Sequence, residues 1–122
     1  MIIGVGVDLV DIDEFRGRLN DELIEELFLP DEAAYARTQR RSWENLAARL
    51  AAKEAAFKAL GAGLSQGQRW RDVEVRREES GAVSLALHGE ARELADTKTV
   101  KGCKVSLSHS RSAAIAIVIM ES

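Results

Sequence analysis

The chain has 122 residues, 46% of them hydrophobic, and carries a formal net charge of −3 at pH 7. This length suits one domain with a modest core, so we expect a single domain over residues 1–122 that gains stability by association. Its one cysteine, Cys103, and its two histidines exclude an intrachain disulfide and argue against a zinc site.

Residues 1–10 predict a buried strand, because nearly all of them are aliphatic. Asp8 is the only charged residue in this run. A carboxylate there is costly unless it is paired, protonated or bound to a metal. A structural role as a cap is the alternative, although Asp11 and Glu14 already have the spacing of a capping box for a helix from about Asp13.

Two short helices are expected next. The first ends at about Phe28, and the chain breaks at Pro30. Asp31 is then expected to cap a helix that runs through about Gln39. Acidic residues dominate the chain up to residue 32, which we interpret as a solvated helical face.

The next segment predicts a long buried helix from about Ser42 to Leu60. It is built largely from Ala and Leu, which lose little side-chain entropy in a helix. Gly61 follows as the C-cap, because glycine tolerates the left-handed conformation that ends many helices.

Four charged residues interrupt the apolar run 46–61 of this helix. At about 100° per residue, Glu54 and Lys58 share one face, and Arg49 and Lys53 share another roughly 140° away. A carboxylate and a lysine one turn apart suit a metal and a phosphate, and two faces can serve two copies of one site at a subunit interface. The alternative is that Glu54 and Lys58 form an exposed ion pair without a function.

The remaining chain predicts an α+β domain with a mostly antiparallel sheet around the long helix. Residues 61–70 read as a loop that forms a wall over a bound ligand. Strands near Asp72–Arg77 and Val83–His88 form a hairpin, and a helix runs from Gly89 to about Thr97.

Residues 105–119 predict two final strands joined by a polar turn. Serines alternate with Val105 and Leu107 in the first strand, and the run 113–119 is apolar on both faces, so we expect it to be buried on both. His109, Ser110 and the residues after them offer imidazole, hydroxyl and guanidinium groups that suit a phosphate. A polar hairpin tip without a ligand is the alternative.

Three segments, residues 6–12, 51–61 and 105–110, together resemble holo-(acyl-carrier-protein) synthase, the small class of 4′-phosphopantetheinyl transferases. The resemblance spans the chain in order and implies that family's fold. It implies transfer of the phosphopantetheine arm of coenzyme A to a serine of an apo acyl carrier protein, with release of 3′,5′-ADP.

The same resemblance implies the catalytic residues Asp8, Glu54 and Lys58. Asp8 and Glu54 hold Mg²⁺, and Lys58 contacts the phosphate that joins the arm to the diphosphate. Val10 stands where larger pseudo-dimeric relatives have a further acid, in agreement with the small class. The base that deprotonates the carrier serine is Glu54, Asp8 or a water on the metal, and we favour a water held by Glu54.

By resemblance the protein is a homotrimer with active sites between subunits, and it acts in fatty acid and lipid biosynthesis. We expect a cytoplasmic location, no signal peptide, no membrane-spanning segment and no nucleic acid partner. Either Arg40 or Arg41 lies near the 3′-phosphate of coenzyme A. The implied coenzyme A-binding residues are Arg41, Arg49, Lys58, Gly61, His109 and Ser110.

Two departures from the family pattern concern its ligands. The first helix is acidic, although acyl carrier proteins are acidic too, so carrier docking either relies on basic residues such as Arg37 or involves a less acidic carrier. Residues 80–83 lack the Gly-Lys-Pro turn that helps to line the nucleotide pocket. Two alternatives to the enzyme are a non-catalytic module that binds coenzyme A or a carrier, and a Mg²⁺-dependent nuclease, which the negative net charge disfavours.

Overall fold

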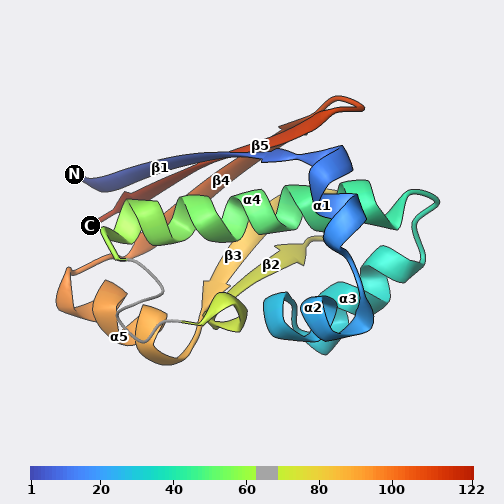
Figure 1. The fold of residues 1–122 in the computed structure, drawn as a ribbon. Coiled ribbons are helices and arrows are strands. Elements are labelled where there is room, and N and C mark those ends of the chain that lie inside the picture. Colours follow the sequence, from blue (N-terminus) through green and yellow to red (C-terminus); the bar gives the residue numbers. More distant parts are fainter. Residues whose placement is uncertain (63–68) are drawn as a thin grey trace.

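The computed structural model describes residues 1–62 and 69–122, and its strands pack on one long helix (Figure 1). The elements in chain order are β1 (Ile2–Asp11), α1 (Ile12–Arg18), α2 (Asp21–Leu27), α3 (Pro30–Arg37), α4 (Ser42–Leu60), the 3₁₀ turn η2 (Trp70–Asp72), β2 (Val73–Arg77), β3 (Val83–Leu87), α5 (Gly89–Thr97), β4 (Gly102–His109) and β5 (Ala113–Glu121). The expected mixture of helices and antiparallel strands is therefore confirmed.

The strands form two separate sheets. One has three strands in the order β1-β5-β4, and the other is the β2-β3 hairpin; all the strand pairs within them are antiparallel. Helix α4 lies across the three-stranded sheet, with α1, α2 and α3 near its start and α5 near its end (Figure 1). The two termini meet, because the Ser122 N–H donates to the carbonyl of Met1.

Helix α4 has the bounds that its composition predicts. Its alanines at 47, 51, 52, 55 and 56 are almost fully buried, so the sheet approaches the helix closely. Gly61 ends the helix with a φ of 72°, as expected of a left-handed C-cap. The predicted cap of α1 is also confirmed, because the Asp11 side chain accepts a hydrogen bond from the Glu14 N–H at 2.8 Å.

The expected cap of α3 is wrong. The helix begins at Pro30 with Leu29 as its N-cap residue, so Asp31 already lies in the first turn. The Leu29 N–H donates to the Glu32 carboxylate at 2.8 Å. Proline favours the first helical position, since its missing N–H would have no partner there.

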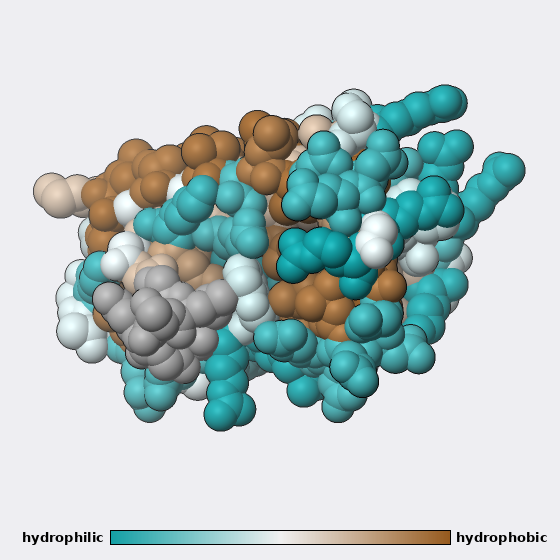
Figure 2. Space-filling view, in the orientation of Figure 1, coloured by the Kyte–Doolittle hydropathy of each residue, from teal (hydrophilic) through white to brown (hydrophobic). Residues whose placement is uncertain are grey.

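The expectation that the last strand is buried on both faces is also wrong within one chain. Ala114, Ala116 and Val118 of β5 face α4 and are buried, whereas Ile115 and Ile117 on the other face are 42% and 40% exposed. Because β5 is the central strand, these isoleucines continue an apolar surface formed by β1, visible along the upper edge of Figure 2.

Two further expectations concern single segments. Most of the loop expected over a ligand, residues 63–68, lies outside the described residues. None of the helices in the described ranges combines the length and apolarity needed to span a bilayer.

Candidate functional site

Two glycines in β1 bring Asp8 beside helix α4. A Cβ added at Gly4 would overlap the Ala59 carbonyl oxygen, and one added at Gly6 would overlap that of Ala55. Only glycine therefore allows this separation of strand and helix. Asp8 is on the same face of β1 as Gly6, which places its side chain against the last turns of α4.

Asp8 and Lys58 form an ion pair across this contact. The Lys58 Nζ donates to Asp8 Oδ1 at 2.9 Å and to the Val7 carbonyl at 3.2 Å. The bond to Asp8 raises the pKa of Lys58 above its usual range. The alternative of an ion pair between Lys58 and Glu54 is not realised in the part of the chain that the structure describes.

Glu54 is the second carboxylate of this group. Burial, together with the nearby Asp8 carboxylate, raises the pKa of Glu54 to about 8. The other oxygen of Asp8, Oδ2, is buried and has no hydrogen-bond partner among residues 1–62 and 69–122. Two close carboxylates, of which Asp8 alone is paired with the Lys58 ammonium group, have the chemistry of a site for a hard cation.

The pair of carboxylates of Asp8 and Glu54 suits Mg²⁺ better than a metal ion whose ligands are all protein side chains. Nowhere in residues 1–62 and 69–122 do three or more His, Cys, Asp or Glu side chains form a group that could hold a metal. Mg²⁺ is usually bound through one or two carboxylates, with waters and substrate phosphates as its other ligands. Asp8 and Glu54 therefore suit a cation that arrives with a phosphorylated substrate.

The opposite face of α4 holds a buried ionic cluster that the sequence prediction missed in part. Lys53 and Glu32 are 0% and 2% exposed, and Lys53 Nζ lies 2.8 Å from Glu32 Oε1. The other oxygen of Glu32 accepts from the Val75 N–H at 2.9 Å. Arg49 Nη1 donates to the Val75 carbonyl at 2.6 Å and lies 3.9 Å from Glu32.

This cluster provides the hydrogen-bond partners that a neighbouring strand would otherwise give to the outer edge of β2. Val75 is in β2, whose other side pairs with β3, so its outward N–H and carbonyl need partners. Glu32 from α3 and Arg49 from α4 supply them, and Lys53 bonds the Val73 and Trp70 carbonyls in the same way. Arg49 is thus buried among its own chain's groups. From the sequence, Glu32 could have been identified only through the expectation that a buried Lys53 needs an acidic partner.

Arg41 and His109 lie together at the other end of α4. They line a cavity of about 350 Å³, with Arg40 beside them. Arg41 pairs with Glu44 at 3.2 Å, and His109 Nδ1 lies 3.9 Å from the same carboxylate. The Ser110 hydroxyl accepts hydrogen bonds from two N–H groups of its own turn, both at 3.2 Å.

One chain does not bring all the expected residues together. Arg41 precedes α4 and Lys58 is in its last turn, about 25 Å apart along the helix axis at 1.5 Å per residue. Asp8 and His109 are on the two outer strands of the three-stranded sheet, with β5 between them. Gly61 lies at the Lys58 end. The structure therefore contains two half-sites at opposite ends of α4.

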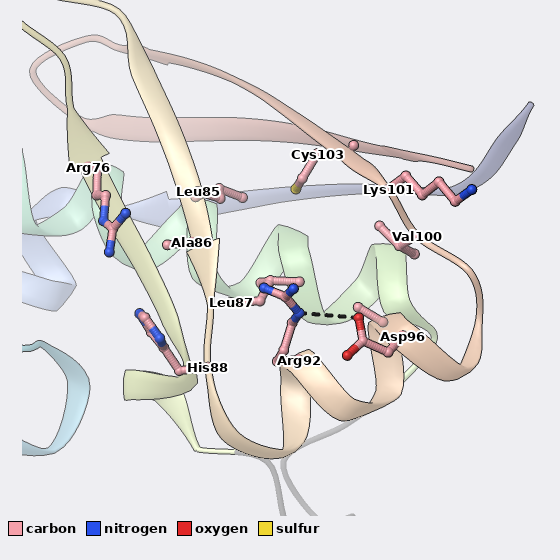
Figure 3. Close-up of a pocket in the computed structure, with 12 residues that line it drawn as sticks. Arg76, Leu85, Ala86, Leu87, His88, Arg92, Asp96, Val100, Lys101 and Cys103 are labelled. Atoms are coloured by element: carbon pink, nitrogen blue, oxygen red, sulfur yellow. Dashed lines mark hydrogen bonds and ion pairs between the residues drawn. The ribbon is translucent and has the colours of Figure 1, made fainter.

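Two larger cavities lie away from both half-sites. One of about 740 Å³ is lined by residues of α3, η2 and β2, among them Asp31, Asp72 and Glu74. Another, of about 690 Å³, opens between β3, α5 and β4 (Figure 3). Its lining includes Cys103, whose thiol pKa burial raises to about 11, so the thiol is un-ionised at neutral pH.

Comparison with known proteins identifies relatives over the whole chain. The model of the 4′-phosphopantetheinyl transferase superfamily matches residues 4–118. The holo-[acyl-carrier-protein] synthase of Geobacter sulfurreducens is 45% identical over 125 residues, which cover 99% of this chain and 98% of that protein. The enzyme of the same name from Solibacter usitatus is 40% identical and covers 99% of both chains.

A solved structure shows the same fold. The crystal structure of a holo-(acyl-carrier-protein) synthase from Bacillus anthracis, in complex with CoA (3′,5′-ADP), matches with a TM-score of 0.84 and 31% identity. The match covers 100% of this chain and 98% of that one. The chain therefore belongs to the holo-(acyl-carrier-protein) synthase family of 4′-phosphopantetheinyl transferases.

Proposed function

We propose that this protein transfers the 4′-phosphopantetheine group of coenzyme A to a serine hydroxyl of an apo acyl carrier protein and releases 3′,5′-ADP. The observation that carries the proposal is the group formed by Asp8, Glu54 and Lys58, in a chain related over its full length to holo-(acyl-carrier-protein) synthases. The serine oxygen forms a bond to the phosphorus next to the arm, and the bond from that phosphorus to 3′,5′-ADP breaks.

In this reaction Asp8 and Glu54 would hold Mg²⁺, which would neutralise charge on the diphosphate. Lys58 is half-exposed at the edge of the site and keeps its charge beside Asp8, so its ammonium group can bind the transferred phosphate. Glu54 orients the water that accepts the serine proton. Positioning and charge neutralisation account for most of the catalysis of such transfers.

We further propose that the active form is a homotrimer with sites between subunits. Two observations support this: the half-sites lie at opposite ends of α4, and one face of the three-stranded sheet exposes large apolar residues. We call this surface the apolar sheet face; its residues are Ile2, Val5, Val7, Leu9, Ile115 and Ile117, between 40% and 65% exposed (Figure 2). Apolar surface of this kind is typical of an interface.

In such a trimer, Arg41, Arg49, His109 and Ser110 of one subunit serve the site that Asp8 of another completes. Arg49 keeps little freedom for this role, because its Nε and Nη1 already donate within its own chain. We also propose a cytoplasmic location and a role in fatty acid and lipid biosynthesis; the family membership supports both proposals. Helix α2 is acidic, whereas α1 has two acidic and two basic residues, so we propose that the carrier docks through Arg37, Arg40 and Arg41.

The intact mass of an apo acyl carrier protein, incubated with this protein, coenzyme A and Mg²⁺, tests the function. We expect the mass to rise by one phosphopantetheine group, and the rise to disappear with EDTA or in the Glu54→Ala variant. No rise with several carriers, in a sample that binds coenzyme A, would support a non-catalytic binding module instead.

A further inference from the structure

The last residue of β2, Arg77, belongs to the cavity at the Arg41 end of α4. Its guanidinium carbon lies 5.8 Å from the centre of the Tyr35 ring, and the guanidinium of Arg49 lies 5.0 Å from the same ring. Arg77 is exposed and forms no ion pair with any residue in the described ranges. Stacking on an aromatic ring restricts a guanidinium group without neutralising its charge.

Arg77 leaves this cavity with an excess of positive charge. Three guanidinium groups and one carboxylate face it, so the lining carries two excess positive charges when His109 is neutral. The carboxylate, that of Glu44, is already paired with Arg41 at 3.2 Å. The full lining is Tyr35, Gln39, Arg40, Arg41, Glu44, Asn45, Arg77 and His109.

A phosphate monoester matches this charge. Its second pKa is about 6, so it carries nearly two negative charges at neutral pH, and arginine binds its oxygens in a forked geometry. A phosphate in a diphosphate bridge carries only one charge. Coenzyme A has one phosphate monoester, at the 3′ position of its ribose, and dephospho-coenzyme A lacks it.

We propose that Arg77 binds the 3′-phosphate of coenzyme A and thereby determines the preference of the enzyme for coenzyme A over dephospho-coenzyme A. This rests on the proposed function. Tyr35 holds the guanidinium at the cavity, and Arg40 is a second cation in the lining that pairs with no carboxylate in the part of the chain that the structure describes. Neither the motifs of the chain nor its helical spacing marks Arg77, because it reaches the cavity from the hairpin.

The neighbouring Arg76 provides a matched control. Successive side chains of a strand point to opposite sides, and Arg76 pairs with Glu74 at 3.1 Å rather than lining this cavity. Figure 3 shows its guanidinium extending toward His88, which bonds the same carboxylate. Arg76→Gln and Arg77→Gln therefore remove the same charge from adjacent exposed positions.

Steady-state kinetics of both variants with coenzyme A and with dephospho-coenzyme A test the proposal. We expect Arg77→Gln to raise the KM for coenzyme A by about 10- to 100-fold, the effect of one charge-assisted hydrogen bond, with little change in kcat. Its KM for dephospho-coenzyme A should equal that of the unaltered enzyme, and Arg76→Gln should change neither value. An equal effect of Arg77→Gln on both substrates, or none on coenzyme A, would overturn the proposal.

Direct binding separates this proposal from the proposed function. By calorimetry, the unaltered protein should bind 3′,5′-ADP more tightly than adenosine 5′-monophosphate, and Arg77→Gln should remove most of the difference. If the protein transfers phosphopantetheine but binds both nucleotides equally, the assignment of Arg77 fails and the transferase stands. If it transfers nothing but shows the Arg77-dependent difference, the reaction fails and the phosphate site stands.

Discussion

Asp8, Glu54 and Lys58 form a group with more acid than base. Lys58 is the one described residue that pairs with Asp8, and Glu54 lies half-buried beside this second carboxylate. A bound cation would displace the proton of Glu54 and offset the burial and the repulsion from Asp8 that raise its pKa. At the scale of single residues, an ionised Glu54 therefore destabilises the folded state when no cation is bound.

The free energy of unfolding should show this pH dependence. The pKa of Glu54 is about 8 in the folded protein, against an ordinary value of 4.5. Between these values the folded state binds more protons than the unfolded state, so Glu54 makes stability fall as pH rises. Urea unfolding in EDTA should show a stability loss from about pH 5 to about pH 8 that is smaller in Glu54→Gln.

Added Mg²⁺ should reverse that loss at the higher pH in the unaltered protein and leave Glu54→Gln nearly unchanged. Identical pH profiles for the two proteins would show that Glu54 titrates normally. The measurement needs neither coenzyme A nor a carrier, so it reports on the carboxylate pair alone.

At the scale of helices and strands, α4 is the element that positions both half-sites. Its contact with β1 depends on Gly4 and Gly6, and its contact with β2 depends on the Glu32–Lys53 cluster. A change at either contact moves one set of functional residues relative to the other.

We expect Gly6→Ala to lower the free energy of unfolding by about 3 kcal/mol, because its Cβ would overlap the Ala55 carbonyl. Transfer activity should fall with it, since β1 would carry Asp8 away from Lys58. Gly17→Ala in α1 is the control: a Cβ added there would meet no atom within 4 Å, so it should raise stability by about 0.5–1 kcal/mol. Equal urea midpoints for the two variants would contradict the close approach of β1 and α4.

Lys53→Met should lower the free energy of unfolding by about 3–5 kcal/mol, because it leaves the Glu32 carboxylate and the Val73 carbonyl buried without their partner. The double variant with Glu32→Gln should lose less than the two single variants together. Arg92→Gln, which breaks the exposed pair with Asp96, should cost no more than about 0.5 kcal/mol. A small effect of Lys53→Met would mean that the cluster does not anchor the hairpin.

The apolar sheet face determines behaviour at the scale of the whole molecule. It combines residues of β1 and β5, which are far apart in sequence and adjacent in the sheet. An isolated chain would expose this surface to water, whereas association would bury it.

Ile117→Glu should therefore convert the proposed trimer to monomers, since it puts a charge in the middle of this surface. Light scattering after gel filtration measures the mass. Ala34→Glu, at an exposed position of α3, should leave the trimer intact. A monomeric unaltered protein would contradict the trimer, and with it the need for two subunits at one active site.

Much of the fold could be predicted from local patterns. The bounds of α4 and its glycine cap follow from composition, and the hairpin strands follow from alternation and turn residues. One error was local, because Pro30 rather than Asp31 begins α3. The other arose where a neighbour outside the segment decides the outcome: β5 is buried on the one face that α4 covers in a single chain.

The sequence by itself determined the family and the two faces of α4, and it indicated the residues proposed for the site, because these depend on motifs and on the helical period. Only the tertiary structure decided that Lys58 pairs with Asp8, that Glu32 supplies the buried partner of Lys53, and that Arg77 joins the cavity of Arg41 and His109. Those contacts join residues 20 or more positions apart, and their geometry depends on how closely strands and helices pack. The local periodicity of a sequence does not indicate how closely its strands and helices pack.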